Sequence, residues 1–258
     1  MPDLFAMEVR AMRRDRAARR GVETFLHERA FDDCLERVLL MDRRFARALL
    51  IGCPDPGWPR RLEAVAGDVA VRDPGPLFAT AAGGAPIVED AWEPPEVAFD
   101  LVLAVGTLDT VNDLPLALQL VRYAMKGDGL FIGAFAGGET LPRLREAMRA
   151  ADALGGGAAP HVHPRIEPAA LSTLLENAGF LRPVVDVDRV QVSYKSFGRL
   201  VTDVRAMGAG NCLRQRPPPL TRAQRDAADR AFAAAGDGER TAETFELLHF
   251  GCWTRANG

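Results

Sequence analysis

The stretch Arg47-Ala48-Leu49-Leu50-Ile51-Gly52-Cys53-Pro54-Asp55-Pro56-Gly57 decides the fold of this chain. The apolar residues 48–51 predict a short buried strand, and Gly52 opens a turn directly after it. A buried strand that ends in a glycine-bearing turn is typical of nucleotide-binding α/β folds. Pro54 and Pro56 occupy positions where such a turn usually has glycine, and proline fixes φ and removes an N–H donor. The sequence therefore predicts a cofactor-binding fold with an altered cofactor turn.

Strand-like and helical segments alternate after this turn. This alternation implies βαβ crossovers and a mostly parallel sheet with helices on both faces. An amphipathic helix is expected before it, at 23–42, and a helical insert, broken by prolines at 217–219, between the two final strands. Further helices are expected at 58–66, 113–125 and 139–153, and strands at 48–51, 68–73, 86–88, 100–105, 130–135, 184–192 and 244–250. The chain divides into an N-terminal arm and helix (1–44), a core (45–195), a helical lid insert (196–240) and the last core strand (241–258).

Composition limits the classes of function. The formal net charge of −3 gives no case for a nucleic-acid partner. Four scattered cysteines, without a C-x-x-C pair, favour reduced thiols over a disulfide framework or a zinc site. His161 and His163 match no usual metal-ligand spacing, so no metal site is predicted. The chain lacks an apolar run of roughly 18 residues and a secretory signal pattern, so we expect a soluble, cytoplasmic protein without a membrane span.

Arginines crowd the N-terminus of the chain. A charge run of this kind is usually a solvated helix face or a loose arm, and contact with an acidic partner surface is the alternative. The residues of the run are Arg10, Arg13, Arg14, Arg16, Arg19 and Arg20.

Acidic residues follow successive strands at the edge where ligands bind in an open parallel sheet. Asp73 ends the second strand, and a carboxylate there is placed to accept hydrogen bonds from a ribose diol. Glu89 and Asp90 follow the third strand, where a carboxylate suits an adenine amino group.

The succession of these motifs over residues 45–135 resembles the class I S-adenosylmethionine (SAM) methyltransferases. Strings outside that region are more specific and resemble the bacterial relatives of the mitochondrial complex I assembly factor 5 proteins, which lie close to the malonyl-carrier-protein methyltransferases. These strings are Arg14-Asp15-Arg16-Ala17-Ala18-Arg19, Val111-Asn112-Asp113-Leu114-Pro115, Gly137-Gly138-Glu139-Thr140-Leu141, Pro183-Val184-Val185-Asp186, Asp203-Val204-Arg205-Ala206-Met207-Gly208-Ala209-Gly210-Asn211 and Thr244-Phe245-Glu246.

The resemblance implies a Rossmann-like, seven-stranded methyltransferase sheet and a SAM site. It implies that Gly52 and the 54–57 turn meet the methionine moiety, Asp73 the ribose and Asp90 the adenine. The full set of cofactor residues that we expect is Gly52, Cys53, Pro54, Gly57, Asp73, Glu89, Asp90 and Gly106. The chain departs from the family at Pro54 and Pro56, and at Asp109-Thr110, where relatives typically carry His-Trp.

Four further residues are candidates for substrate binding, each with a structural alternative. Asp109 suits a cationic group such as an arginine side chain, or caps the helix that begins near Asp113. Thr140 lies at the ligand edge, or caps the helix near 141. Arg205 and Asn211 suit a peptide or carrier, or form a packing corner in the insert.

Two functions follow from this pattern. The first is a SAM-dependent methyltransferase acting on a protein or carrier-bound substrate; because methyl transfer relies on positioning, no catalytic residue is predicted. The second is a respiratory complex I assembly factor, either arginine-modifying or a non-catalytic scaffold that has lost SAM binding. The sequence leaves open whether the chain is an enzyme.

Overall fold

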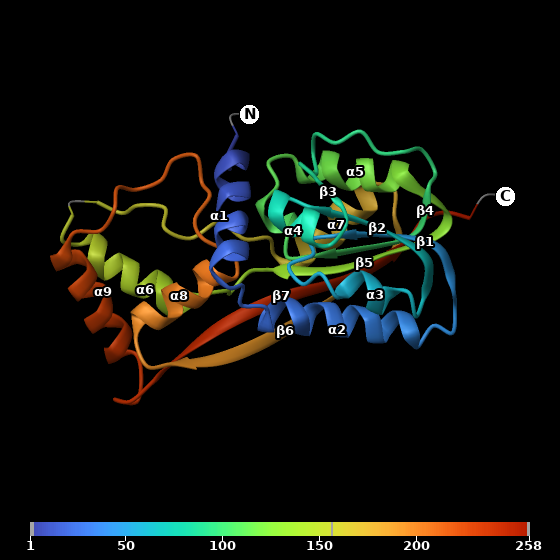
Figure 1. Ribbon diagram of the computed structural model, residues 1–258. Coiled ribbons are helices and arrows are strands. Elements are labelled where there is room, and N and C mark those ends of the chain that lie inside the picture. The colour runs from blue at the N-terminus through green and yellow to red at the C-terminus, as the bar shows by residue number, and fades with distance from the viewer. Residues whose placement is uncertain (1–2, 156, 257–258) are drawn as a thin grey trace.

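The computed structural model describes residues 3–155 and 157–256 and contains one seven-stranded sheet with the order β3-β2-β1-β4-β5-β7-β6. All neighbouring strands pair in parallel except β7, which runs antiparallel to both β5 and β6 (Figure 1). The strands are β1 (Phe45–Ile51), β2 (Ala66–Asp73), β3 (Ala85–Pro86), β4 (Phe99–Val105), β5 (Met125–Ala136), β6 (Leu181–Tyr194) and β7 (Thr241–Trp253). The predicted fold class, an α/β sheet of seven mostly parallel strands, is confirmed.

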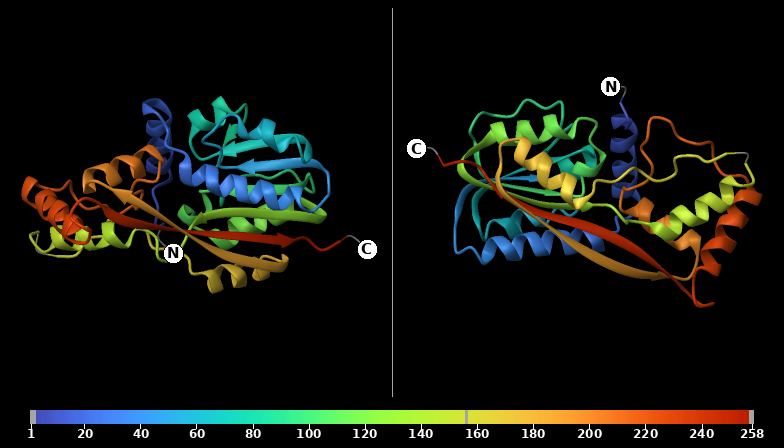
Figure 2. Two further views of the ribbon diagram at one scale, coloured as in Figure 1. Left: turned by 90° about the horizontal axis from the view of Figure 1, so that it is seen from below. Right: turned by 180° about the vertical axis from the view of Figure 1, so that it is seen from behind.

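Helices cover both faces of the sheet, as the alternation predicts (Figure 2). The predicted N-terminal amphipathic helix is α2, and two helices fall in the predicted insert between β6 and β7. The second of these, α9, begins with a capping box in which Thr221 and Gln224 bond to each other's backbone N–H. The helices are α1 (Met7–Arg20), α2 (Phe25–Leu39), α3 (Trp58–Leu62), α4 (Pro76–Ala81), the 3₁₀ turn η1 (Leu108–Thr110), α5 (Leu114–Ala124), α6 (Pro142–Asp152), α7 (Pro168–Asn177), α8 (Phe197–Ala206) and α9 (Arg222–Ala234).

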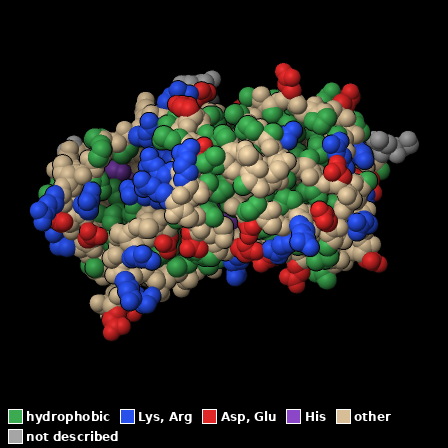
Figure 3. All heavy atoms as spheres, viewed as in Figure 1, with side chains coloured by type: hydrophobic (Ala, Val, Ile, Leu, Met, Phe, Trp, Pro, Cys, Tyr) green, Lys and Arg blue, Asp and Glu red, His purple; other side chains and the backbone are tan. Residues whose placement is uncertain are grey.

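A helical lid projects from one end of the sheet. It consists of α6, α8 and α9, and the long strands β6 and β7 extend beyond the core to reach it (Figure 1). A separate apolar cluster, which includes Phe197, Phe232 and Phe245, holds these helices together. Between core and lid stands α1, which contacts α4 on one side and α8 on the other. Lys and Arg side chains gather on this part of the surface (Figure 3).

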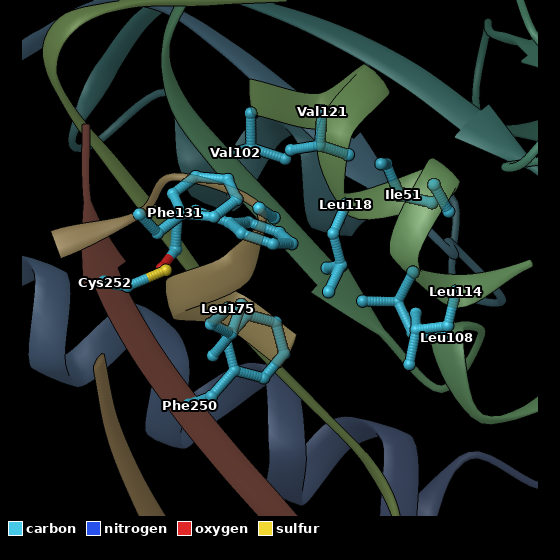
Figure 4. Packing of buried hydrophobic residues seen from close by; sticks show 14 of the residues in the cluster. Ile51, Val102, Leu108, Leu114, Leu118, Val121, Phe131, Leu175, Phe250 and Cys252 are labelled. Carbon is cyan, nitrogen blue, oxygen red and sulfur yellow. The ribbon is translucent and has the colours of Figure 1, made fainter. Parts of the chain in front are cut away.

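Alternating residues of the central strands pack on opposite faces. In β1, Leu49 and Ile51 join the cluster covered by α5 and α7, while Leu50 joins the cluster covered by α2 and α3. Figure 4 shows the first cluster, where Leu118 of α5 and Leu175 of α7 lie near side chains of β5 and β7. This burial on both faces holds the strand ends rigidly in place. Among the described residues, no helix is long and apolar enough to cross a membrane.

Candidate functional site

The turn after β1 begins with a glycine that no other residue can replace without strain. Gly52 has φ +83°, and a Cβ there would come within 2.1 Å of the Val105 carbonyl oxygen on β4. The next residue, Cys53, donates its backbone N–H to Oδ2 of Asp73 at 2.7 Å. Pro54 is buried, and Gly57 donates its N–H to the Asp55 carboxylate. The predicted turn therefore forms at the predicted sheet edge, beside the carboxylate at the end of β2.

Asp73 has no acceptor position left for a ligand. Arg14 donates from Nε to Oδ1 at 2.8 Å and from Nη2 to Oδ2 at 2.6 Å. The backbone N–H of Cys53 donates to Oδ2, and that of Gly75 donates to Oδ1 at 2.6 Å. An ionised carboxylate offers about four acceptor positions, and the protein's own donors take all of them. Asp73 is 0% exposed.

Glu89, after β3, is also paired with an arginine of α1. Arg10 donates from Nη1 to Oε2 at 2.6 Å and from Nη2 to Oε1 at 2.8 Å. The same Nη2 also donates to the carbonyl oxygen of Thr107, beyond the end of β4. Burial alone would lower the pKa of Arg10, but the Glu89 carboxylate outweighs it and the pKa is raised above its ordinary value. Two-pronged pairs of this kind are the strongest ionic contacts that a protein forms.

Both arginines come from α1, so the prediction that the N-terminal arginines form a solvated face or a loose arm is wrong for Arg10 and Arg14. Positions four apart lie on one helix face, and this face also buries Val9 and Ala17. The buried carboxylates compensate the two charges and make their burial possible. Arg19 and Arg20 stay exposed, as the run predicts.

His27 of α2 closes the site from the other side. Its ring lies so close to Gly106, the predicted cofactor glycine after β4, that a Cβ there would meet Cδ2 at 2.7 Å. Burial, and secondarily the charge of Arg14, lower the pKa of His27 to about 4. At neutral pH the ring is therefore uncharged, and it fills space above the end of β4.

The other residues predicted for the site also bond within the chain. Asp90, predicted to meet adenine, accepts the backbone N–H of Asp113 at 2.8 Å. Asp109 forms a partly buried ion pair with Arg165, and Asp113 itself caps α5, so the capping alternative for Asp109 is wrong. No feature of the sequence points to Arg165 as the partner of Asp109, because the two residues are far apart along the chain.

The capping role for Thr140 is also wrong. Its hydroxyl donates to the carbonyl oxygen of Glu246 at 2.9 Å and accepts that residue's N–H at 3.0 Å, which ties the end of β5 to β7. The N-cap of α6 is Leu141, which makes no side-chain cap.

Among the described residues, no three His, Cys, Asp or Glu side chains gather to hold a metal ion.

A small cavity remains beyond the ends of β4 and β5. Its volume is about 100 Å³, and it is lined by residues that include Arg10, Arg14, His27, Asp109 and Thr140. His163 also lines it, and burial, followed by the charge of Arg165, lowers the pKa of His163 to about 4. Small-molecule sites have volumes of roughly 300–1,000 Å³. Of the eight predicted cofactor residues, only Gly106 lines this cavity, and with α1 in this position the cavity is too small for SAM.

Arg205 and Asn211, the two other predicted substrate residues, do not line this cavity. They line an adjoining groove between α1 and the lid, which shares Val204 and Gly210 with the cavity. Asn211 donates to the carbonyl oxygens of Pro160 and His161 and accepts the N–H of Leu213, so it holds loops together. The structure brings Cys53 and Asp73 of the cofactor set into contact, whereas Asp90 bonds to Asp113 and Gly57 bonds to Asp55. It places the substrate set in two neighbouring pockets. The binding roles themselves stay predictions.

Proteins that are similar in sequence to this chain include methyltransferases and NDUFAF5 proteins. The chain is 38% identical over 169 residues to the arginine-hydroxylase NDUFAF5, mitochondrial, of Rattus norvegicus, which covers 62% of this chain and 47% of the relative. It is 30% identical over 163 residues to the malonyl-[acyl-carrier protein] O-methyltransferase of Xylella fastidiosa, covering 61% of this chain and 52% of the relative. The chain is a relative of the class I methyltransferases. It spans about half the length of these curated relatives. No family model matches it.

Solved structures of methyltransferases share the fold of this chain. The Haloferax volcanii putative methyltransferase, in complex with the Trm112 methyltransferase activator, has a TM-score of 0.53 and 14% identity, covering 99% of this chain and 100% of the other. The N-methyltransferase NodS from Bradyrhizobium japonicum, in complex with S-adenosylhomocysteine, has a TM-score of 0.51 and 15% identity, covering 95% and 98%. The fold is therefore one that holds a SAM-derived ligand in other proteins.

Proposed function

We propose that this methyltransferase-fold chain works as a non-catalytic assembly factor for respiratory complex I, a protein-binding scaffold that has lost SAM binding. The observation that carries the proposal is the double pairing of Arg14 with Asp73 and of Arg10 with Glu89. The two carboxylates at the nucleoside end of the fold are neutralised by the chain itself. A ribose diol has to displace a buried guanidinium to reach Asp73, which leaves that guanidinium uncompensated.

The proline-bearing turn supports the same conclusion. Pro54 is buried in the turn that faces the end of β4, and it offers no N–H to a ligand carboxylate. His27 covers Gly106 on the opposite side. Three separate elements, the β1 turn, α1 and α2, therefore occupy the sheet edge at which the resemblance implies a SAM site, and this supports the proposal.

A role in assembly fits the relatives named NDUFAF5, and the resemblance implies complex I as the target. The solved complex with an activator protein supports the idea that a protein of this fold takes a protein partner. The partner of this chain is then a subunit of complex I or a protein associated with it.

A second candidate function is SAM-dependent transfer after α1 has moved away. The resemblance favours it, because Gly52, Asp73 and Gly106 match by position the cofactor residues that the resemblance implies. The connection after α1 also contains Gly21, which has φ +96° and an open environment that suits a hinge. In this function α1 is a cover that leaves when the acceptor binds.

Calorimetric titration with SAM and S-adenosylhomocysteine separates the two functions. We expect no binding heat with the wild-type chain at millimolar ligand. Micromolar binding that Asp73→Asn abolishes would overturn the proposal in favour of the transferase. Pro54→Gly serves as a matched control, because it restores the turn but keeps the α1 arginines, and we expect it to bind no better than wild type. Circular dichroism confirms that each variant is folded.

The assembly role is tested by a second experiment, in the host cell. Removal of the chain should lower the amount of assembled complex I on native gels, and the wild-type chain should restore it. A SAM-binding chain whose removal leaves complex I unchanged would contradict both parts of the proposal.

A further inference from the structure

The groove between α1 and the lid is much larger than the cavity beside it. Its volume is about 860 Å³, within the roughly 300–1,000 Å³ typical of small-molecule sites. Its walls come from α1, α6, α8, α9 and the proline segment 217–219. Figure 3 shows Lys and Arg side chains gathered beside a hollow in which hydrophobic side chains are visible.

The groove is strongly basic. Five arginines line it, against the single carboxylate of Asp229, and they are Arg13, Arg16, Arg205, Arg216 and Arg225. None of the five forms an ion pair with any residue in the described parts of the chain. His161, which also lines the groove, is held by Asp152 at 2.7 Å. The arginines therefore carry a positive charge that the chain itself does not neutralise.

Arg13 is the centre of this charge. Its Nε is buried and has no hydrogen-bond partner in the described residues, and its guanidinium lies against Gly210. Burial lowers the pKa of Arg13, and the charges of Arg216, Arg16 and Arg205 lower it further. Four guanidinium groups thus repel one another around a buried donor without an acceptor. An arrangement of this kind is costly in the free protein and is relieved by a bound anion.

Apolar side chains also line the groove. Leu144 and Met148 come from α6, Phe197 and Val201 from α8, and Leu220 from the loop before α9. Such a surface favours a hydrocarbon body over a fully hydrated ion. The combination of arginines and apolar side chains in one groove favours a molecule that has both a negatively charged group and an apolar body.

We propose that this groove binds a small amphiphilic anion, one that carries a phosphate or carboxylate group on an apolar body. Arg13, with Arg16, Arg205 and Arg216 around it, receives the anionic group, and Phe197, Val201 and Met148 contact the body. The proposal is independent of the function proposed for the chain, because none of these residues contacts Asp73 or Glu89. It also assigns the predicted substrate residue Arg205 to this groove.

Four probes test the proposal on the full chain by calorimetry: octyl phosphate, octanoate, octanol and inorganic phosphate. We expect octyl phosphate, octanoate or both to bind at least tenfold more tightly than octanol and than inorganic phosphate. The ratio between the first two identifies the anionic group. Octanol binding as tightly as the anions would overturn the role of the arginines. Inorganic phosphate binding as tightly as octyl phosphate would overturn the role of the apolar body.

Variants locate the binding. Arg13→Gln should weaken the binding of the tighter anion at least tenfold, and Val201→Ser should weaken it while leaving inorganic phosphate unaffected. Arg19→Gln is the matched control, because Arg19 lies on the same helix but outside the groove, and it should change nothing. Equal affinity in Arg13→Gln and wild type would overturn the proposal. So would the absence of binding of both octyl anions at millimolar concentration, and if an acidic peptide then binds with the same Arg13 dependence, the groove is a peptide site instead.

Discussion

Two faces of α1 place arginines in opposite circumstances. On the inner face, Arg10 and Arg14 are buried, and each is held by a carboxylate through two hydrogen bonds. On the outer face, Arg13 and Arg16 line the groove and make no ion pair within the described residues. The same residue type on one helix therefore closes one site and leaves another charged and open. Whether an arginine of α1 closes a site or leaves it charged therefore depends on whether the chain supplies a carboxylate partner for it.

The volumes of the two sites express the same difference. The inner cavity measures about 100 Å³ and the outer groove about 860 Å³. A site whose charges are matched internally closes onto its own side chains, because the attraction between opposite charges strengthens as the distance between them shrinks. A site with unmatched like charges stays open.

The largest effect is expected at the inner face. Arg14→Ala leaves the Asp73 carboxylate buried without its ionic partner, and it should lower the free energy of unfolding by about 3–5 kcal/mol. Urea denaturation measures this change. Arg19→Ala is the control: Arg19 is 64% exposed and pairs with Asp15 at 3.7 Å, so it should cost less than about 1 kcal/mol.

Asp73→Asn in the Arg14→Ala background should recover part of the loss, because it removes the uncompensated charge. If Arg14→Ala costs no more than Arg19→Ala, the inner pair is not a closed, buried contact and the comparison of the two faces fails.

The sheet was predictable because its signals are local. Hydrophobic periodicity in segments such as 48–51 and 184–192, the glycine turn at Gly52 and the insert before β7 are all visible in short windows of sequence. The contact between the turn after β1 and the end of β2 was predictable for the same reason, since the ends of parallel strands meet at one edge. Cys53 and Asp73 do come together there, and the cofactor roles stay predictions.

The closure of the site was not predictable, because it depends on contacts between distant residues. Arg14 is 59 residues from Asp73, and Arg10 is 79 residues from Glu89. One local signal was available: Arg10 and Arg14 are four apart and share a helix face with Val9 and Ala17. That pattern indicates buried arginines, but it does not identify the carboxylates that receive them.

A smaller effect is expected from the histidine that covers Gly106. The pKa of His27 is lowered to about 4 in the folded chain, whereas an unfolded histidine titrates near about 6.5. The unfolded state therefore binds more protons between these values, and stability falls as the pH falls from about 6.5 toward 4. The slope for one such group approaches about 1.4 kcal/mol per pH unit.

Unfolding free energies at pH 7 and pH 5 test this point in wild type and His27→Asn. The wild-type chain should lose up to about 2 kcal/mol more than the variant over this interval. His163 titrates in the same direction in both proteins, so its contribution cancels in the difference. Equal losses would show that His27 is not held neutral against Gly106.

The smallest effect is expected at the outer face, and it is the sharpest test of the comparison. Arg13→Gln removes a charge that Arg216, Arg16 and Arg205 repel, and glutamine keeps part of the side chain that packs against Gly210. We expect the free energy of unfolding to change by less than about 0.5 kcal/mol, with a gain favoured over a loss.

Arg14→Gln is the matched control, since it makes the same chemical change one residue further along the helix and should cost several times more. A large loss in Arg13→Gln would mean that the outer arginine also has a partner within the chain. In that case the two faces of α1 are alike, and the groove carries no unmatched charge for a ligand to neutralise.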